Sequence, residues 1–271
     1  MTERQAVYTH GHQDAVLRSH RSRTAANSAG YLLPELRPGQ ALLDVGCGPG
    51  TITADLAELV GPTGRVVAVD RSAEVLAQAA EHVAGRGIGN VTFAAADAYR
   101  LPYADGEFDV VHAHQVLQHV ADPVALLREL RRVTRPGGVV ACRDADYAAM
   151  AWYPELPELA DWMALYQRVA RANGGEPDAG RRLASWARAA GFGTVDCSSS
   201  TWTYATAGQR DWWGDSWADR VVGSGIVDTA LAGGFATPGE LARIAAGWRR
   251  WAADPDGWFA VLSGEVLARV G

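Results

Sequence analysis

The first half of the chain alternates short apolar runs with stretches in which apolar residues recur every three or four positions. The runs have the length of buried strands, and the spaced stretches have the period of amphipathic helices. Strands that alternate with helices in this way form a parallel sheet with helices on both faces. The predicted strands are 41–45, 65–70, 91–96, 108–112 and 139–143, and the predicted helices between them are 51–60, 72–85 and 123–134.

The second half keeps these periods but changes in composition, because it holds all ten Trp residues of the chain. Two strand-like runs, at 195–204 and 258–268, enclose two helical patterns. We expect these runs to complete the same sheet as an antiparallel pair with a helical insertion between its strands. The predicted helices of this half are 156–172, 180–190, 209–231 and 238–251.

Composition and charge narrow the range of functions. The 271 residues are 48% hydrophobic and 21% charged, which is an ordinary globular composition. The formal net charge is −6, so we expect no nucleic-acid partner and no attraction to an anionic membrane surface. All 25 basic residues are Arg, so the chain has neither a Schiff-base Lys nor the Lys of a phosphate-binding P-loop.

The cysteines and the apolar runs exclude further classes of protein. Cys47, Cys142 and Cys197 are too widely spaced for a zinc site, and each is expected to be a small buried residue beside an apolar stretch. No apolar run approaches the roughly 18 residues that span a bilayer. The N-terminal stretch has no apolar segment of the kind found in secretory signals. We therefore expect a cytoplasmic protein with no membrane partner.

The strongest chemical signal is the glycine-rich sequence LLDVGCGPGT at 42–51, which joins a predicted strand to a predicted helix. Gly46 and Gly48 allow a sharp turn and a close approach of a ligand to the backbone, because neither carries a Cβ. The free N–H groups at the start of the following helix attract an electronegative ligand group. Asp44 precedes the turn and is expected either to cap it or to bind a cationic ligand group.

Two acids follow at the ends of the next two predicted strands. Asp70 ends the second strand, where a carboxylate beside a glycine turn accepts both hydroxyls of a ribose. Asp97 follows the third strand at the same edge of the sheet, where a carboxylate can accept a hydrogen bond from an adenine amino group. The alternatives without a ligand are a helix N-cap for Asp70 and a turn residue for Asp97.

A nicotinamide dinucleotide site is the rival interpretation of the same turn. Such a site favours GxGxxG or GxGxxA, whereas Thr51 stands at the third position of that pattern here. A dinucleotide also has no need of Asp97. These differences weigh against a nucleotide-dependent dehydrogenase, which is kept as an alternative.

In these motifs the sequence resembles the class I S-adenosylmethionine-dependent methyltransferases, and within them the small-molecule enzymes of the ubiquinone and menaquinone biosynthesis type. The resemblance implies a Rossmann-like α/β fold with seven mostly parallel strands, helices on both faces and an antiparallel last strand. It also implies methyl transfer from S-adenosylmethionine to a small-molecule acceptor. Besides the glycine turn, it is carried by VVAVDRS (66–72), ADAYRLPYADGEFDVVHAHQVLQHVADP (96–123) and LRRVTRPGGVV (130–140).

The resemblance further implies roles for individual residues. The glycines of the turn, Gly50 included, would cradle the methionine part of the cofactor, and Gln115 would contact the same part. Asp70 would hold the ribose, and Asp97 would recognise the adenine. The complete expected set for the cofactor is Asp44, Gly46, Cys47, Gly48, Thr51, Asp70, Arg71, Asp97, Ala98 and Gln115.

The candidates for catalysis lie near the N-terminus and at the end of the fourth strand. Tyr8, His10 and His12 resemble the lid that related enzymes close over the cofactor. His114 alternates with His112 and so shares one face of its strand with it. Histidine is the usual base near neutral pH, although a structural role is the alternative for each. No carboxylate set accompanies the histidines, so we expect no metal.

We expect a single methyltransferase domain over 1–271. Its parts would be an N-terminal helical lid (1–35), a cofactor-binding core (36–147) and a C-terminal part (148–271) that completes the sheet and adds a Trp-rich substrate cap. A related protein that binds the cofactor without transferring its methyl group is an alternative that the sequence does not separate.

The Trp-rich region and a basic run complete the picture. Trp212, Trp213 and Trp217 are hard to bury together, which favours an aromatic pocket for an apolar or cationic acceptor. The same region could bury a contact between two copies in a homodimer. The basic run that ends at Arg23 is expected to be a solvated helix face.

Overall fold

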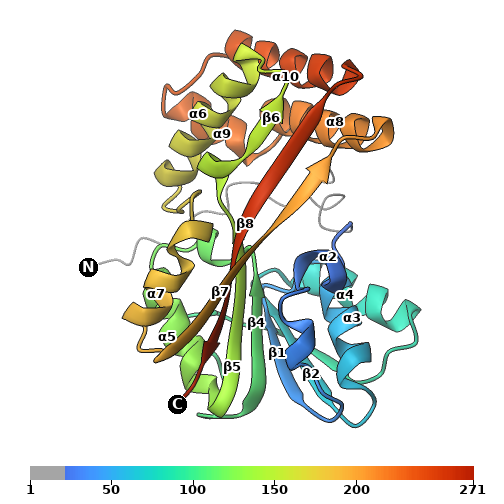
Figure 1. Cartoon of the computed structure of the whole chain (residues 1–271), viewed down its shortest axis with the longest axis vertical. Helices are drawn as coiled ribbons and strands as arrows, with labels where there is room; N and C mark the ends of the chain where they lie inside the picture. The colour runs from blue at the N-terminus through green and yellow to red at the C-terminus, as the bar shows by residue number, and fades with distance from the viewer. Residues whose placement is uncertain (1–21) are drawn as a thin grey trace.

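The computed structural model describes residues 22–271, and Figure 1 shows how their helices and strands are arranged. The described strands form one sheet in the order β3-β2-β1-β4-β5-β8-β6, and β7 pairs with β8 outside this path. The first five strands are parallel to one another, as predicted. Their bounds are β1 (Ala41–Val45), β2 (Arg65–Asp70), β3 (Val91–Ala95), β4 (Phe108–His114) and β5 (Thr134–Ala145).

The last strand runs antiparallel to each of its neighbours, which confirms the predicted end of the sheet. It pairs with β5 through its second half and with β6 through its first residues, while β7 pairs along its whole length. The strand β6 was not predicted, because a three-residue strand carries too little periodicity to be recognised. The bounds are β6 (Ala151–Tyr153), β7 (Thr194–Tyr204) and β8 (Trp258–Arg269).

Alternate residues of the central strands enter two cores, one on each face of the sheet. Leu42 packs with the apolar side of α3, and its neighbour Leu43 packs with α5 and α7 on the other face. Strands buried on both faces read as continuous apolar runs, which is why they stood out in the sequence. The helices around this part are α2 (Ala25–Ser28), α3 (Thr51–Val60), α4 (Ala73–Gly85), α5 (Pro123–Val133) and α7 (Leu183–Ala189).

A further core, made by the Trp-rich half of the chain, forms an upper lobe above the sheet in Figure 1. The long strands β7 and β8 run from the lower lobe into the upper one and connect the two. The predicted helical insertion between them is present and packs against α6, but the single helix predicted over 209–231 is divided at Ser224 into two helices. The helices of the upper lobe are α6 (Pro157–Ala172), α8 (Ala207–Gly223), α9 (Gly225–Ala232) and α10 (Pro238–Ala253).

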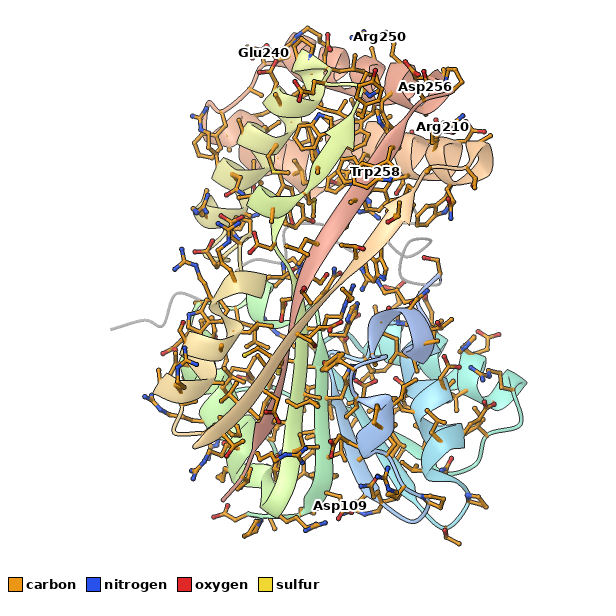
Figure 2. All side chains as sticks on the ribbon, in the orientation of Figure 1. Asp109, Arg210, Glu240, Arg250, Asp256 and Trp258 are labelled. Atoms are coloured by element: carbon orange, nitrogen blue, oxygen red, sulfur yellow. The ribbon has the colours of Figure 1, made fainter. Side chains whose placement is uncertain are left out.

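Tryptophan rings fill the upper lobe. Trp162 meets Trp217 and Trp248 edge to face, with ring centroids 4.6 and 4.9 Å apart. Edge-to-face pairs of large rings stabilise a core beyond the area that they bury. Polar side chains such as Glu240 and Arg250 lie on the outside of this lobe (Figure 2). Most of the Trp residues of the second half therefore belong to one core or pack against it, whereas Trp186 packs against the core of the lower lobe and Trp258 is exposed.

Short turns and one exposed strand complete the fold. Cys47 and Cys142 are buried as expected, but the expectation is wrong for Cys197, which is exposed. Cys197 lies on β7, whose one partner among the described strands is β8, so β7 forms an exposed edge.

The short 3-10 helices are η1 (Leu33–Glu35), η2 (Leu117–His119), η3 (Tyr147–Ala149) and η4 (Gly180–Arg182).

Candidate functional site

A cavity of about 1310 Å³ lies at the carboxyl edge of the parallel strands and continues into the upper lobe. Its lower wall is formed by the glycine turn after β1 and by the loops after β2, β3 and β4. Its upper wall is formed by β7 and α8. The cavity brings together most of the described residues that the sequence predicted for cofactor or catalysis: Asp44, Gly46, Cys47, Gly48, Thr51, Asp70, Arg71, Asp97, Ala98, His114 and Gln115. Gly50, which was also expected to cradle the methionine part, does not line the cavity and packs against Ala79.

The turn after β1 requires glycine at two positions. Gly46 has a φ of +70°, and a Cβ there would lie 2.6 Å from Cγ2 of Val116. Gly50 precedes α3 with a φ of +78°, and a Cβ there would lie 2.9 Å from that of Ala79. Both positions combine a left-handed backbone with a contact that leaves no space for a side chain. Of the glycines in this turn, Gly46 and Gly48 line the cavity, and because they carry no side chain they present backbone to it.

Asp70 connects the glycine turn to the neighbouring strand. Its Oδ2 accepts a hydrogen bond from the N–H of Gly48 at 3.2 Å, and its Oδ1 accepts one from the N–H of Ser72 at 3.1 Å. The N-cap of α4 is Ser72, so the alternative role of Asp70 as the helix cap is wrong. Each carboxylate oxygen can accept a second hydrogen bond. Asp70 can therefore hold the turn and accept hydroxyls from the cavity together.

Asp97 makes the turn contact that the alternative predicted and also lines the cavity. Its Oδ1 accepts a hydrogen bond from the N–H of Tyr99 at 3.0 Å. The side chain is exposed to the cavity mouth. A carboxylate accepts about four hydrogen bonds, so this one contact leaves it able to bind a ligand.

Asp44 anchors β1 to the elements beside it. Its Oδ2 accepts a hydrogen bond from the hydroxyl of Thr53 at 2.6 Å, and its Oδ1 lies 2.8 Å from Nδ1 of His112. Asp44 is 2% exposed and His112 is fully buried. These bonds tie β1 to α3 and β4 beneath the turn. Both partners lie on α3 and β4 rather than in the turn, so Asp44 joins these elements instead of capping the turn, and its role toward a ligand stays a prediction.

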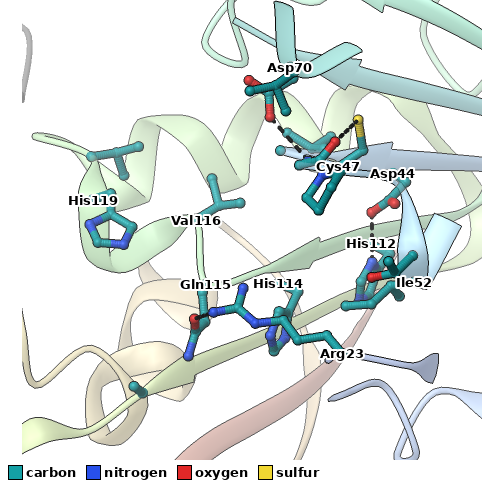
Figure 3. Close-up of a pocket in the computed structure, with 18 of the residues that line it drawn as sticks. Arg23, Asp44, Cys47, Ile52, Asp70, His112, His114, Gln115, Val116 and His119 are labelled. Carbon is teal, nitrogen blue, oxygen red and sulfur yellow. Dashed lines mark hydrogen bonds and ion pairs between the residues drawn. The ribbon is translucent and has the colours of Figure 1, made fainter. Parts of the chain in front are cut away.

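Gln115 adopts a left-handed backbone with a φ of +53°, which no other described non-glycine residue does. Such a conformation costs on the order of 1–3 kcal/mol and occurs preferentially at functional sites. The side-chain Oε1 accepts a 2.6 Å hydrogen bond from Arg23 (Figure 3). Arg23 also lines the cavity, so the expectation of a solvated face for this residue is wrong. Sequence reasoning missed Arg23 because only the tertiary contact with Gln115 distinguishes it from other basic residues.

His114 lies between two rings on the cavity wall. Its ring is stacked parallel to that of His112 with centroids 6.5 Å apart, and Trp202 lies 5.7 Å away on β7. The predicted shared face of the two histidines is confirmed (Figure 3). His114 is nearly buried and borders the cavity at the point where its lower and upper parts meet.

Two groups that line the cavity, His119 and Cys47, are unsuited to proton transfer or nucleophilic attack. Burial and the charge of Arg23 lower the pKa of His119 to about 3, so this ring is neutral at physiological pH. Burial, followed by the charges of Asp44 and Asp70, raises the pKa of the Cys47 thiol. Cys47 is therefore a protonated packing residue, since the thiolate is the nucleophilic form.

The upper part of the cavity is lined by aromatic residues, as predicted, but Trp213 and Trp217, which were expected to be hard to bury, are both buried. Tyr204 stacks on Trp213 with ring centroids 4.2 Å apart, and the nearly buried Arg220 lies 5.2 Å over the ring of Trp217. Arg220 was missed in the sequence. A signal for it exists, because Trp213, Trp217 and Arg220 are four and three positions apart and so share one face of α8.

The remaining candidates Tyr8, His10 and His12 lie outside the described residues. Within residues 22–271, no group of His, Cys, Asp and Glu side chains could hold a metal ion. In the same range, no helix has the length and apolar character needed to cross a bilayer.

Comparison with known proteins agrees with the chemistry of the cavity. A family model described as a methyltransferase domain matches residues 36–204. An uncharacterized methyltransferase of Schizosaccharomyces pombe is 36% identical over 272 residues, which cover 97% of this chain and 96% of that protein. A probable methyltransferase of Aspergillus luteorubrus, LtbC, is 30% identical over 280 residues, 96% of each chain. The match to the demethylmenaquinone methyltransferase of Geobacillus stearothermophilus is 36% identical over 121 residues, 45% of this chain and 52% of that enzyme.

Solved structures share the fold at low sequence identity. Phosphoethanolamine N-methyltransferase 2 of Haemonchus contortus superposes with a TM-score of 0.54 at 20% identity, over 87% of this chain and 50% of that one. The [4+2]-cyclase SpnF superposes with a TM-score of 0.53 at 22% identity, over 98% and 88%. These likenesses show the Rossmann-like sheet, while the family model and the relatives show the kind of protein. The chain belongs to the class I S-adenosylmethionine-dependent methyltransferases.

Proposed function

We propose that the protein transfers the methyl group of S-adenosylmethionine to a small-molecule acceptor that binds in the upper part of the cavity. The observation that carries this proposal is the continuity of the cavity, because the glycine turn and the Trp-lined wall border the same space. Its volume of about 1310 Å³ exceeds the roughly 300–1,000 Å³ of a pocket for one ligand. The cavity therefore has space for a cofactor and an acceptor side by side.

The lower part of the cavity suits S-adenosylmethionine. Asp70 would accept the ribose hydroxyls, Asp97 the adenine amino group, and the bare backbone of Gly46 and Gly48 would lie against the methionine part. When bound, the cofactor supplies a methyl group already activated by a positively charged sulfur. The chain then contributes mainly the position of the acceptor and the exclusion of water.

The α-carboxylate of the cofactor needs a cation, and Arg23 is the residue that we propose for it. Arg23, Arg71 and Arg220 are the arginines among the described lining of the cavity. Arg71 follows the ribose-binding position, and Arg220 belongs to the upper lobe. Arg23 instead contacts Gln115, the residue expected at the methionine part. A guanidinium binds a carboxylate through two parallel hydrogen bonds.

His114 is the described residue that we propose to face the reacting atoms. It ends the strand that leads to Gln115 and lies beside Trp202, at the junction between the two parts of the cavity. A neutral imidazole there could accept a proton from an acceptor that must lose one. Tyr147 lines the same space. Tyr8, His10 and His12 stay predictions for this role.

The division of labour along the chain follows the cavity. In this proposal, 36–147 binds the cofactor, 148–271 covers the acceptor, and the segment up to residue 35 closes over both. The Trp-rich region also led us to expect a homodimer. Trp162, Trp217, Trp248 and Trp251 are at most 1% exposed within the chain, so aromatic content alone no longer argues for a contact between copies.

The test measures cofactor binding and turnover on the native chain and on Asp70→Ala. S-adenosylhomocysteine binding, measured by calorimetry, should weaken about 10- to 100-fold in the variant, because a hydrogen bond to a charged group contributes about 1.5–3 kcal/mol. The matched control is Asp196→Ala, an exposed Asp on β7 outside the cavity, which should bind normally. Mass spectrometry with a panel of acceptors then detects methylated product and S-adenosylhomocysteine.

Each outcome separates the alternatives. If the native chain binds S-adenosylmethionine and S-adenosylhomocysteine and forms a methylated product, methyl transfer is supported. Binding without consumption of S-adenosylmethionine by any acceptor indicates a related protein that catalyses no methyl transfer. Binding of NAD in preference to both compounds would contradict the assignment of the site.

A further inference from the structure

The chain that follows β4 at 115–119, which we call the β4 loop, forms part of the cavity wall. Gln115, Val116 and His119 line the cavity, and Figure 3 shows where they lie on this loop. Cγ2 of Val116 occupies the space in which Gly46 would carry a Cβ, so the loop packs directly against the glycine turn. The β4 loop therefore borders the space that we propose for the methionine part of the cofactor.

The first residue of the β4 loop has a backbone conformation that needs support from its surroundings. Gln115 is left-handed, with a φ of +53°. A non-glycine residue keeps such a conformation only where the contacts around it over-determine the backbone. The N–H of Gln115 donates to the carbonyl oxygen of Arg143 on β5 at 2.7 Å, which fixes one point. The rest of the loop must be fixed by other residues.

The side chain of Gln118 connects the end of the β4 loop to β5. Gln118 is 3% exposed and is not among the described residues that line the cavity. Its Oε1 accepts a hydrogen bond from the N–H of Ala145 at 3.1 Å, and its Nε2 lies 2.9 Å from Nε2 of His119. The pKa of His119 is lowered to about 3, so this ring is neutral and its Nε2 can accept a hydrogen bond from the amide. One buried amide thus holds both β5 and His119.

The backbone of Gln118 is held on two sides. Its N–H donates to Oδ1 of the fully buried Asp144 at 3.0 Å, and the N–H of Leu117 donates to the same carboxyl group. Its carbonyl oxygen accepts a hydrogen bond from the N–H of Glu176 at 3.0 Å. The fit on this side is tight, because a Cβ on Gly175 would lie 2.5 Å from that oxygen. The loop is therefore fixed between β5 and the segment that follows α6.

We propose that Gln118 and Asp144 are positioning residues of the cofactor site, which hold Gln115 and the β4 loop in the conformation that receives the amino-acid part of S-adenosylmethionine. This inference rests on the proposed function and adds two residues that act through Gln115 without touching the ligand. The adenine and the ribose are assigned to Asp97 and Asp70, which lie on other loops. A disturbed β4 loop should therefore weaken only those ligands that carry the amino-acid part.

The test compares two probes on the full chain by calorimetry. They are S-adenosylhomocysteine and 5′-methylthioadenosine, which shares the adenine, the ribose and the sulfur but has no amino-acid part. Gln118→Met keeps the size of the side chain and removes both of its hydrogen bonds. We expect S-adenosylhomocysteine to bind about 10-fold more weakly to this variant, because the loop is in its binding conformation for a smaller fraction of the time. The affinity for 5′-methylthioadenosine should not change.

A pair of variants at Asp144 tests the second positioning residue. Burial raises the pKa of Asp144 to about 8, so at about pH 7 the group is mainly the neutral acid, which an amide resembles. Asp144→Asn keeps an oxygen that accepts from the N–H of Gln118, and it should bind S-adenosylhomocysteine within about twofold of the native chain. Asp144→Ala removes the acceptor and should weaken S-adenosylhomocysteine about 10-fold, again with no change for 5′-methylthioadenosine.

A double-mutant cycle and a control assign the effect to Gln115. Gln115→Gly removes both the side chain and the cost of a left-handed backbone, so in that variant Gln118→Met should cause no further loss of S-adenosylhomocysteine affinity. The control is Thr134→Val, at the end of β5 away from the cavity. It removes the buried hydrogen bond from Thr134 to the carbonyl oxygen of Leu130, and it should lower stability while leaving both affinities unchanged.

Several results would overturn the inference. They are unchanged S-adenosylhomocysteine affinity in Gln118→Met, an equal loss for both probes, an Asp144→Asn variant as weak as Asp144→Ala, and full additivity of Gln115→Gly and Gln118→Met. If Gln118→Met fails to fold, the two Asp144 variants decide. If 5′-methylthioadenosine binds too weakly to measure, the Gln115 cycle decides. Absence of S-adenosylhomocysteine binding to the native chain would instead contradict the proposed function, so the two failures are distinguishable.

Discussion

Replacing Gly46 by Ala tests whether the glycine turn is shaped by steric necessity. The new Cβ would face two obstacles in the structure. The backbone has a φ of +70°, and the methyl group would lie 2.6 Å from Cγ2 of Val116. Gly87 offers a matched control, because its φ is +72° but a Cβ there would meet nothing within 4 Å. The difference between the two variants therefore isolates the clash.

The magnitudes follow from these contacts. The left-handed backbone costs an alanine about 1–2 kcal/mol, which is the full expected effect of Gly87→Ala. Forcing a methyl group into the side chain of Val116 adds about 1–3 kcal/mol. Gly46→Ala should therefore lower the free energy of unfolding by about 2–5 kcal/mol. Val116→Ala removes the side chain that the new methyl group would meet. In the Val116→Ala variant, Gly46→Ala should therefore lower the free energy of unfolding only by the cost of the left-handed backbone.

Urea denaturation measures these free energies for the native chain, Gly46→Ala, Val116→Ala and the double variant, with Gly87→Ala as the control. The interaction energy between the two sites should be about 1–3 kcal/mol, with the second change relieving the first. S-adenosylhomocysteine affinity, measured on the same samples, reports whether the turn still accepts a ligand. The reasoning is refuted if Gly46→Ala costs no more than Gly87→Ala, or if Val116→Ala brings no relief.

Three further predictions concern groups elsewhere in the fold. Burial raises the pKa of Asp144 from 3.8 to about 8, so its folded form favours the proton and the native chain loses stability as pH rises from about 4 through 8. Asp144→Asn should remove this loss of stability. Urea denaturation should show that the variant is more stable than the native chain by a few kcal/mol at most, and that the difference is larger at pH 9 than at pH 5. A difference that does not depend on pH would contradict this prediction. Glu265→Gln removes the carboxylate that lies 3.3 Å from Nε of the buried Arg143. In urea denaturation it should lower the free energy of unfolding by about 3–5 kcal/mol, because Arg143 is left as a buried charge without this partner. A loss below about 1 kcal/mol would show that the pair is dispensable. Thr237→Ala breaks the capping box that Thr237 forms with Glu240 at the start of α10. Thermal unfolding should show a stability loss of about 1 kcal/mol, and S-adenosylhomocysteine affinity should not change. A change in affinity would show that the cap is coupled to the site.

The local elements and the cofactor residues could be predicted because they depend on short-range patterns. The strand before Gly46 and the helix after it follow from apolar periodicity, and the positions of Asp70 and Asp97 follow from the rule that parallel strands end at one edge. The structure agrees at each of these points, since all line one cavity. The exposed Cys197 was not predictable in the same way, because its environment depends on which strand lies at the edge of the sheet.

The sequence by itself thus determined the order of the parallel strands and their helices, the glycine turn, the acids beside it and the family, but neither the short strand β6 nor the break between α8 and α9. These features depend on neighbours within a few residues, or on spacing along one strand or helix. Only the tertiary structure decided that Arg23 meets Gln115, that Asp44 meets His112, and that Arg220 lines the upper part of the cavity. Arg23 and Gln115 are 92 positions apart, and Asp44 and His112 are 68 apart. Contacts at such separations are fixed by the packing of whole elements, which no local pattern of residues records.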